Sequence, residues 1–263
     1  LRLLAASVVH SVYLDKWDSR HCLLINAPTL AHLMEQCQSL KVLTLDNLQM
    51  DENHCRVLGV YSRSDLKIHL IGCKFTSAGT SALAEVLERN QGPTSLTRCK
   101  MDYSVLADGL RGNRRLKCLA LRFFSSSSHE NDKRKLLAIA SALRENKGLV
   151  ELNVSHDFTM SDETWYAVCD SLKTHPTLEV LNMPSTLNTA TATATAITSR
   201  IQALLDMMKV NASIHTIHLD FRYSETEMYR ESVIPFLETN RLRPRLLAIQ
   251  KTLPIAYRAK VLG

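Results

Sequence analysis

The sequence predicts an α/β solenoid, a horseshoe with a parallel inner β-sheet and outer α-helices. A phrase of the form Leu-x-x-Leu-x-Leu recurs along the chain, each copy follows a segment whose apolar residues have helical spacing, and in three copies an Asn stands three residues before the first apolar position. These copies read Leu110, Asn113, Leu116, Leu119, Leu121; Leu143, Asn146, Leu149, Leu152, Val154; and Met208, Asn211, Ile214, Ile217, Leu219. Such self-similarity is typical of a repeat architecture.

Seven copies can be aligned by the first apolar position of the phrase, at intervals of 20 to 36 residues. These positions are Leu40, Asp65, Leu96, Leu116, Leu149, Leu178 and Ile214. We expect an eighth, degenerate copy before them, with Cys22 and Leu24 as its apolar pair. One strand and one helix cannot bury their apolar sides alone, so neighbouring units are expected to stack around one continuous core.

Two kinds of position in the phrase lead to specific structural predictions: the position three residues before its first apolar residue, which we call the Asn slot, and the apolar positions of the strand, which we call the core slots. Ser62, Pro93 and His175 fill the Asn slot in other copies. Where Asn is present, its amide is expected to satisfy backbone groups at the turn from helix to strand, because Asn readily bonds its local backbone. Leu119 and Leu152, as core residues of the strands, should be almost fully buried.

The first elements follow from local patterns. Residues 1–13 are apolar and do not begin with Met, which favours an outer helix or partial cap over a signal peptide and indicates a fragment of a longer protein. Thr76 precedes a segment with Leu83, Val86 and Leu87 at helical spacing. Ser161 is a predicted N-cap, since acidic residues follow it in the first turn.

Two polar segments interrupt the repeats. Residues 125–132 contain four consecutive Ser, and this predicts a loop at the rim. Residues 185–199 alternate Thr and Ala, which we interpret as a low-complexity insertion in the longest repeat, since long surface insertions cost little closure entropy. A strand, or a platform for phosphorylation or glycosylation, is the alternative for the second segment.

The repeat array is expected to cover residues 1–240, with the degenerate unit at its start. Beyond Asn240 the phrase fails, and Pro244 lacks a backbone donor and disfavours helix at Arg243. Residues 241–263 are therefore expected to form a helical C-terminal cap or the start of a following segment. The alternative is a basic amphipathic segment that recruits an acidic surface.

The repeats resemble the ribonuclease-inhibitor-like class of leucine-rich repeat proteins over roughly residues 20–240. The resemblance implies units that alternate strand and helix, and a role as a recognition module in receptors, inhibitors or regulatory proteins. Ribonuclease inhibitor binds basic ribonucleases, whereas this chain is itself basic, with a formal net charge of +6. That partner is therefore not carried over.

The composition argues against a membrane-spanning protein and against a small disulfide-bonded or zinc-binding domain. Of the 263 residues, 45% are hydrophobic, but no apolar run is long enough to predict a membrane span. Seven Cys residues are scattered without C-x-x-C spacing, so the sequence suggests neither a disulfide framework nor a zinc site. We expect an intracellular protein, cytoplasmic or nuclear, with reduced thiols.

The sequence offers little for catalysis. It lacks the common phosphate-binding, nucleotide-binding, hydrolase and metalloprotease motifs. His215 and His218 are three apart on an expected strand, so they face opposite sides and are a poor metal pair. Cys118 is more simply a packing residue than a nucleophile. We expect no enzyme activity, no catalytic residues, no metal and no cofactor.

Alternation along the strand assigns the third, fifth and seventh positions of the phrase to the concave face. Positive charge there gathers on three adjacent units, where only Asp102 opposes it. The predicted protein-binding residues are Lys67, His69, Arg98, Lys100 and Arg122. The alternative is that this charge serves solubility. An acidic protein segment is favoured over nucleic acid, because the predicted face has no aromatic residue on which bases could stack.

The sequence thus predicts a non-enzymatic protein–protein interaction scaffold, which binds a macromolecular partner through its concave face and rim loops. One alternative is the substrate-recognition part of a ubiquitin ligase. Another is a regulator of a small GTPase, since one GTPase-activator family uses this fold.

Overall fold

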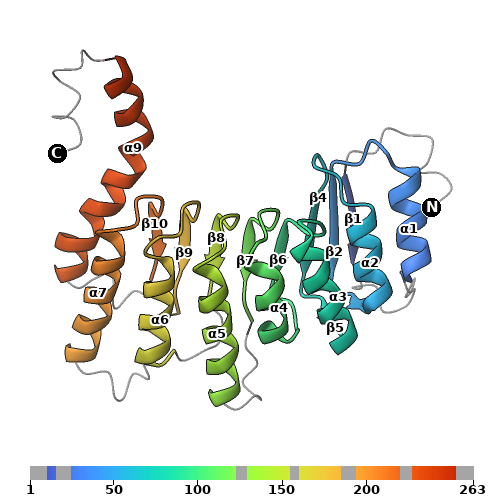
Figure 1. Ribbon diagram of the computed structural model, residues 1–263, viewed down its shortest axis with the longest axis horizontal. Coiled ribbons are helices and arrows are strands. Elements are labelled where there is room, and N and C mark those ends of the chain that lie inside the picture. The colour runs from blue at the N-terminus through green and yellow to red at the C-terminus, as the bar shows by residue number, and fades with distance from the viewer. Residues whose placement is uncertain are drawn as a thin grey trace.

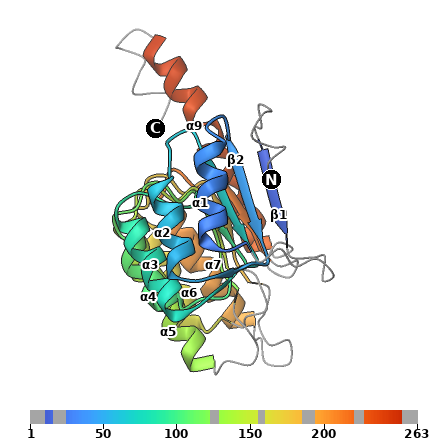
Figure 2. The ribbon, with the colours of Figure 1, turned by 90° about the vertical axis from the view of Figure 1, so that its right-hand side faces the viewer.

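The computed structural model describes residues 11–15, 25–122, 129–154, 160–184, 194–219 and 227–252 of the chain. Within these residues the protein has two layers, a parallel β-sheet and a row of helices along one of its faces (Figures 1 and 2). The eight strands of the sheet lie in the order β1-β2-β4-β6-β7-β8-β9-β10. Strand and helix alternate along the chain, as the repeated phrase predicted.

The strands are short and all pair in parallel. They are β1 (Ser11–Asp15), β2 (Val42–Asp46), β4 (Lys67–Ile71), β6 (Ser95–Thr97), β7 (Cys118–Ala120), β8 (Glu151–Asn153), β9 (Val180–Asn182) and β10 (Thr216–His218). A second small ladder, β3 (Gln49–Met50) and β5 (Lys74–Phe75), lies between strand and helix in the second and third units.

The helices cross from the end of one strand to the start of the next. They are α1 (Ala27–Gln36), α2 (Glu52–Val60), α3 (Ser77–Glu88), α4 (Tyr103–Leu110), α5 (His129–Leu143), α6 (Asp162–Leu172), α7 (Ala194–Met208), the π-helical turn η1 (Tyr229–Val233) and α9 (Ile234–Thr252). Several begin at side-chain caps, and the predicted caps Thr76 and Ser161 accept from the N–H groups of Gly79 and Thr164. None of the helices among the described residues is both long and apolar enough to cross a bilayer.

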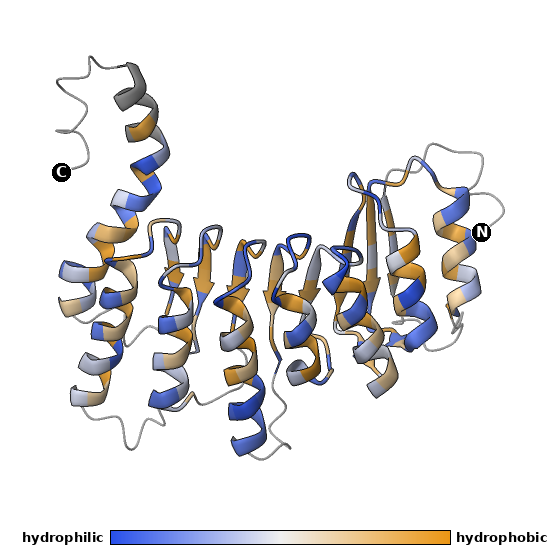
Figure 3. Cartoon of the chain, in the orientation of Figure 1, coloured by the Kyte–Doolittle hydropathy of each residue, from blue (hydrophilic) through white to orange (hydrophobic). Residues whose placement is uncertain are grey.

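One continuous core runs between the two layers. Figure 3 shows hydrophobic residues along the strands, and in β2 the side chains alternate between buried and half-buried. Leu119 and Leu152 are both 0% exposed, as predicted. They are lateral neighbours in β7 and β8, so each unit packs on the next through equivalent residues.

The predicted role of the Asn slot is confirmed. The side-chain amide of Asn146 donates to the carbonyl oxygens of Leu110 (2.5 Å) and Asn113 (2.8 Å), and its oxygen accepts from the N–H groups of Gly148 and Leu149 at 2.9 Å. Asn211 makes the corresponding four bonds, and Asn113 makes three of them, with its amide donating to the carbonyl oxygen of Leu87 alone. Each amide thereby links a turn to the turn of the preceding unit.

The array extends to Asn240, which occupies the next Asn slot. Its amide donates to the carbonyl oxygens of Asn211 (3.1 Å) and Ile214 (2.8 Å), so the start of α9 is fixed to the last strand-bearing unit. Pro244 was expected to disfavour helix at Arg243, but α9 runs through both residues. Pro244 is exposed, so water can bond the carbonyl group that lacks its helical partner. The chain therefore has no helix break at residue 240.

The strand register of the unit that contains β6 differs from the prediction by an odd number of residues, three when compared with β7. Leu96 was placed at the first position of the phrase, but it pairs with Leu119, the fourth position of its copy, and with Leu70, the sixth position of its copy. The error arose because Cys99 and Met101 follow Leu96 with the spacing of the phrase. Both are buried, but they lie beyond β6, and a shift of an odd number of residues exchanges the two faces.

Four smaller predictions, two near the N-terminus and two in the polar segments, are tested only in part. The N-terminal unit uses Val12 and Leu14 in β1, whereas Cys22 and Leu24 lie outside the described residues, as do residues 1–10. Residues 11–13 are therefore strand rather than helix. The predicted loop 125–132 and insertion 185–199 both end within helices, because α5 begins at His129 and α7 at Ala194; their earlier parts lie outside the described residues.

Candidate functional site

The face of the sheet opposite the helices is an open surface made by every unit. Figure 2 shows the helices on one side of the strands only. Parallel pairing arranges the outward side chains in straight rows across the strands. One row is Tyr13, Thr44, His69, Ser95, Cys118, Glu151, Val180 and Thr216, and the next is Asp15, Asp46, Ile71, Thr97, Ala120, Asn153, Asn182 and His218. Most of these side chains from β6 onward are small and uncharged.

The structure places two of the predicted binding residues on this open face. Lys67 and His69 belong to β4 and lie on the same side of the strand, Lys67 exposed and His69 half-buried. Burial lowers the pKa of His69, and the nearby charge of Lys67 lowers it further. His69 is therefore neutral at pH 7 and contributes no positive charge to the face.

The other three predicted residues lie elsewhere. Arg98 follows β6 in the left-handed region of the backbone, with φ of 54°, and the corrected register puts Ser95 and Thr97 on the open face instead. The backbone of Lys100 forms an isolated parallel β-bridge with that of Lys74, beside the small second ladder. Arg122 follows β7, and its N–H donates to the Tyr103 hydroxyl at 3.1 Å. These residues lie past the carboxyl ends of the strands, whereas Lys67 is at the amino end of β4, so the five do not form one patch.

A different basic group surrounds Lys67, and we call it the amino-edge cluster. It consists of Lys41, Arg63, Lys67, Arg114, Arg115 and Lys117, together with the carboxylate of Asp65. Lys67 is the first residue of β4, and the others lie in the turns that lead into β2, β4 and β7. The N–H of Lys67 donates to the carbonyl oxygen of Lys41 at 2.8 Å, which places their two chain segments side by side.

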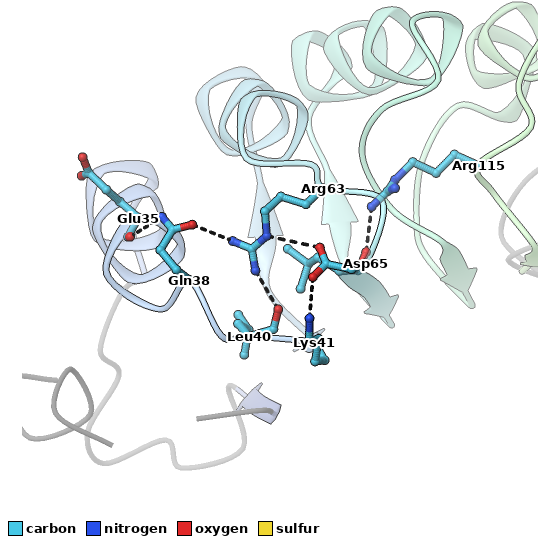
Figure 4. Close-up of polar contacts among 8 residues, drawn as sticks. Glu35, Gln38, Leu40, Lys41, Arg63, Asp65 and Arg115 are labelled. Carbon is cyan, nitrogen blue, oxygen red and sulfur yellow. Dashed lines mark hydrogen bonds and ion pairs between the residues drawn. The ribbon is translucent and has the colours of Figure 1, made fainter. Parts of the chain in front are cut away.

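Asp65 neutralises one part of the cluster. Its carboxylate pairs with the Lys41 ammonium at 2.5 Å and lies 3.5 Å from Nε of Arg63 (Figure 4). The hydrogen bond to Lys41 is the main cause that lowers the pKa of Asp65, and the charge of Arg63 adds to it. The Arg63 guanidinium also donates to the carbonyl oxygen of Leu40 at 2.7 Å, which bridges two units.

Arg115 reaches farthest across the array. Its Nε donates to the carbonyl oxygen of Gly92 at 2.7 Å, and its Nη2 donates to that of Leu66 at 2.8 Å, two units away (Figure 4). Both acceptors are uncharged, and partial burial lowers the pKa of Arg115. The guanidinium is therefore held in place without a carboxylate to compensate its charge.

Sequence reasoning missed most of this cluster because it examined only the positions that face outward along the strand. Arg114, Arg115 and Lys117 occupy spacer positions of a complete copy, directly before β7. The available signal was the density of basic residues in the spacers between Asn113 and Cys118. Their proximity to Lys67 follows from the strand order β4-β6-β7, which the sequence does not state.

The helix layer has a hollow of about 410 Å³ between α5, α6 and α7, which is less suited to binding. Its charged lining is already paired, since Asp170 accepts from Arg144 at 2.7 Å and from Lys173 at 3.1 Å. These two cations, Lys173 first, lower the pKa of Asp170. The strand side of the molecule is therefore the better candidate surface.

Comparison with known proteins supports the fold and assigns no family. No protein-family model matches the chain, and no curated protein matches it. Among solved structures, one titled "Leiomodin-1 Actin-Binding Site 2 (ABS2)" aligns with a TM-score of 0.50 and 19% identity, over 64% of this chain and 93% of that one. The tropomodulin C-terminal domain of Caenorhabditis elegans aligns over 85% of this chain and 98% of that one, with a TM-score of 0.40 and 14% identity. The fold is of the leucine-rich-repeat type.

Proposed function

We propose that the protein is a non-enzymatic interaction module, a curved repeat array of the ribonuclease-inhibitor-like class. It binds a macromolecular partner on the strand side, through the open face of the sheet and the adjoining loops. The observation that carries this proposal is the open face itself, where each strand contributes outward side chains in straight rows. Concave or open repeat surfaces of this kind serve as extended binding sites.

The chemistry of the open face favours a folded or extended protein over a small molecule. Small neutral side chains such as Thr97 and Asn182 are half-buried on this face, so they do not project far enough to obstruct a broad contact. A small-molecule site would call for a concave apolar pocket with a few converging polar groups. The rows on this sheet are instead spread over eight strands.

We further propose that the protein works inside the cell. Six of its cysteines lie among the described residues, and all six are free thiols. Burial raises the pKa of Cys55 and of Cys169 to about 12, so these thiols are inert packing groups. Free buried thiols are typical of a reducing compartment.

Affinity purification with a matched pair of variants tests the proposal. T97R/N182R adds two long charged side chains to the open face, and S81R/S141R adds the same groups to exposed positions of α3 and α5. Proteins captured from a cell lysate are identified by mass spectrometry. The proposal expects a partner that wild type and S81R/S141R retain and T97R/N182R loses. Equal capture by all three would contradict it.

Actin is the first defined partner to test, because the leiomodin-1 structure is titled as an actin-binding site. Cosedimentation with filamentous actin and a gel-shift with monomeric actin measure this directly, with the same two variants. Binding that T97R/N182R abolishes would identify actin as a partner of the open face. No binding by wild type would remove actin and leave the lysate experiment to decide the proposal.

A further inference from the structure

We propose that the amino-edge cluster is the docking site for an extended acidic segment of a protein partner. This inference rests on the proposed function, because it gives the chemistry of a partner that binds on the strand side. It replaces the sequence-based cluster, of which only Lys67 lies at this edge.

The charge of the cluster is largely uncompensated. Lys67, Arg114 and Lys117 are exposed, and none of them pairs with a carboxylate among the described residues. Arg115 donates only to carbonyl oxygens. Asp65 is the one carboxylate within the cluster, and it is shared by Lys41 and Arg63. The amino edge of the sheet therefore carries an excess of positive charge that would attract an anionic group.

Three cations of the cluster, Arg63, Arg115 and Lys117, are held in place by backbone carbonyl oxygens before any partner binds. Arg115 is fixed by the carbonyl oxygens of Gly92 and Leu66, and Arg63 by that of Leu40. The Nζ of Lys117 donates to the carbonyl oxygen of Gly148 at 3.1 Å. Because these side chains are already ordered, less conformational entropy is lost when an acidic group docks.

The spacing of the cluster fits an extended peptide. Neighbouring strands are about 4.8 Å apart, so the turns from β2 to β7 span roughly 15 Å. An extended peptide presents alternate side chains on one face about every 7 Å, so two or three carboxylates can meet the cluster at once. The cluster contains no aromatic residue on which nucleic-acid bases could stack, which favours an acidic protein segment over a single-stranded nucleic acid.

The test measures binding of a fluorescein-labelled twelve-residue peptide of alternating Asp and Ser by fluorescence anisotropy, using the 263-residue chain. K67E/K117E reverses two charges of the cluster. K74E/R134E makes the same change in net charge at exposed positions on β5 and α5. We expect K67E/K117E to weaken binding at least about tenfold at low salt, with the difference shrinking as salt rises, and the control to weaken it less than about threefold.

Several results would overturn the inference. These are equal losses in the two variants, no loss in K67E/K117E, or tighter binding of a twelve-nucleotide oligothymidylate than of the peptide. Circular dichroism and melting temperature check the fold, and K67Q/R114Q, at two exposed positions, replaces K67E/K117E if reversal at Lys117 unfolds the chain. A lysate partner that T97R/N182R loses and K67E/K117E retains would overturn this inference alone. Failure of the proposed function is seen instead as equal capture by wild type, T97R/N182R and S81R/S141R.

Discussion

The side-chain amide of Asn146 shows how one residue joins two repeat units. It is 2% exposed and makes four hydrogen bonds to backbone groups, two in the preceding unit and two in its own turn. Buried backbone groups without a partner are costly, so the turn depends on this amide. The role was predictable from sequence, because in three copies of the phrase an Asn stands three residues before the first apolar position.

Asn146→Ala should therefore lower the free energy of unfolding by about 1–3 kcal/mol, because it leaves buried carbonyl and N–H groups unsatisfied. Urea denaturation followed by circular dichroism measures the change. Asn53→Ala, at an exposed position of α2, is the matched control and should change stability by no more than about 0.5 kcal/mol. Similar small effects for both variants would contradict a structural role for the slot.

His175 fills the Asn slot incompletely. Its Nδ1 accepts from the N–H of Leu178 at 3.1 Å, but its buried Nε2 has no hydrogen-bond partner among the described residues. An Asn here could both accept and donate, as Asn146 and Asn211 do. His175→Asn should therefore stabilise the fold by about 1 kcal/mol. A less stable variant, by thermal or urea unfolding, would show that this turn has adapted to the imidazole.

The pH dependence of the same variant gives a second test. Burial lowers the pKa of His175 to about 4, below its ordinary value near 6.5. The unfolded chain then binds a proton first as the pH falls, so wild type loses stability between pH 6.5 and 4, by up to roughly 3 kcal/mol. His175→Asn should lose less over this range. Parallel curves of unfolding free energy against pH would contradict the assignment.

At the scale of the element, the sequence predicted the apolar stripes of the core but not the register of strand β6. The spacing of apolar residues correctly predicted alternating helices and strands, because each element must bury one side against its neighbours. The prediction for β6 failed because Leu96, Cys99 and Met101 have the spacing of the phrase, whereas β6 pairs with β4 and β7 in a different register. Local spacing could not reveal the error, because Leu96, Cys99 and Met101 are buried in the observed register as well.

Leu152→Ala tests the register of β8 within this core. The side chain is fully buried and packs beside Leu119, so truncation should destabilise the protein by about 2–5 kcal/mol, through lost burial and a cavity. Val60→Ala, at a position 76% exposed, is the control and should stay within about 0.5 kcal/mol. Thermal unfolding of the two variants measures the difference. A small effect at Leu152 would mean that this residue faces outward.

At the scale of the whole molecule, the strand order decides which charges gather. The cluster predicted from the sequence combined residues at both ends of the strands. Alternation predicts the face of the sheet on which a side chain lies, but not how far along the strand it lies relative to residues of other strands. Arg115 contacts the carbonyl oxygen of Leu66, which is 49 residues earlier, and only the stacking of the units brings them together. Of the predicted binding residues, Lys67 and His69 lie on the predicted face, and Lys67 alone joins the basic edge.

The central claim is that a partner binds the strand side of the array and not its helix layer. Site-specific incorporation of a photo-crosslinking phenylalanine at Thr97, on the open face, or at Ser141, on α5, tests it most directly. After irradiation in a cell lysate, we predict a discrete protein adduct from the Thr97 variant that is absent or much weaker from the Ser141 variant. Equal adducts from both positions, or an adduct from Ser141 alone, would contradict the claim.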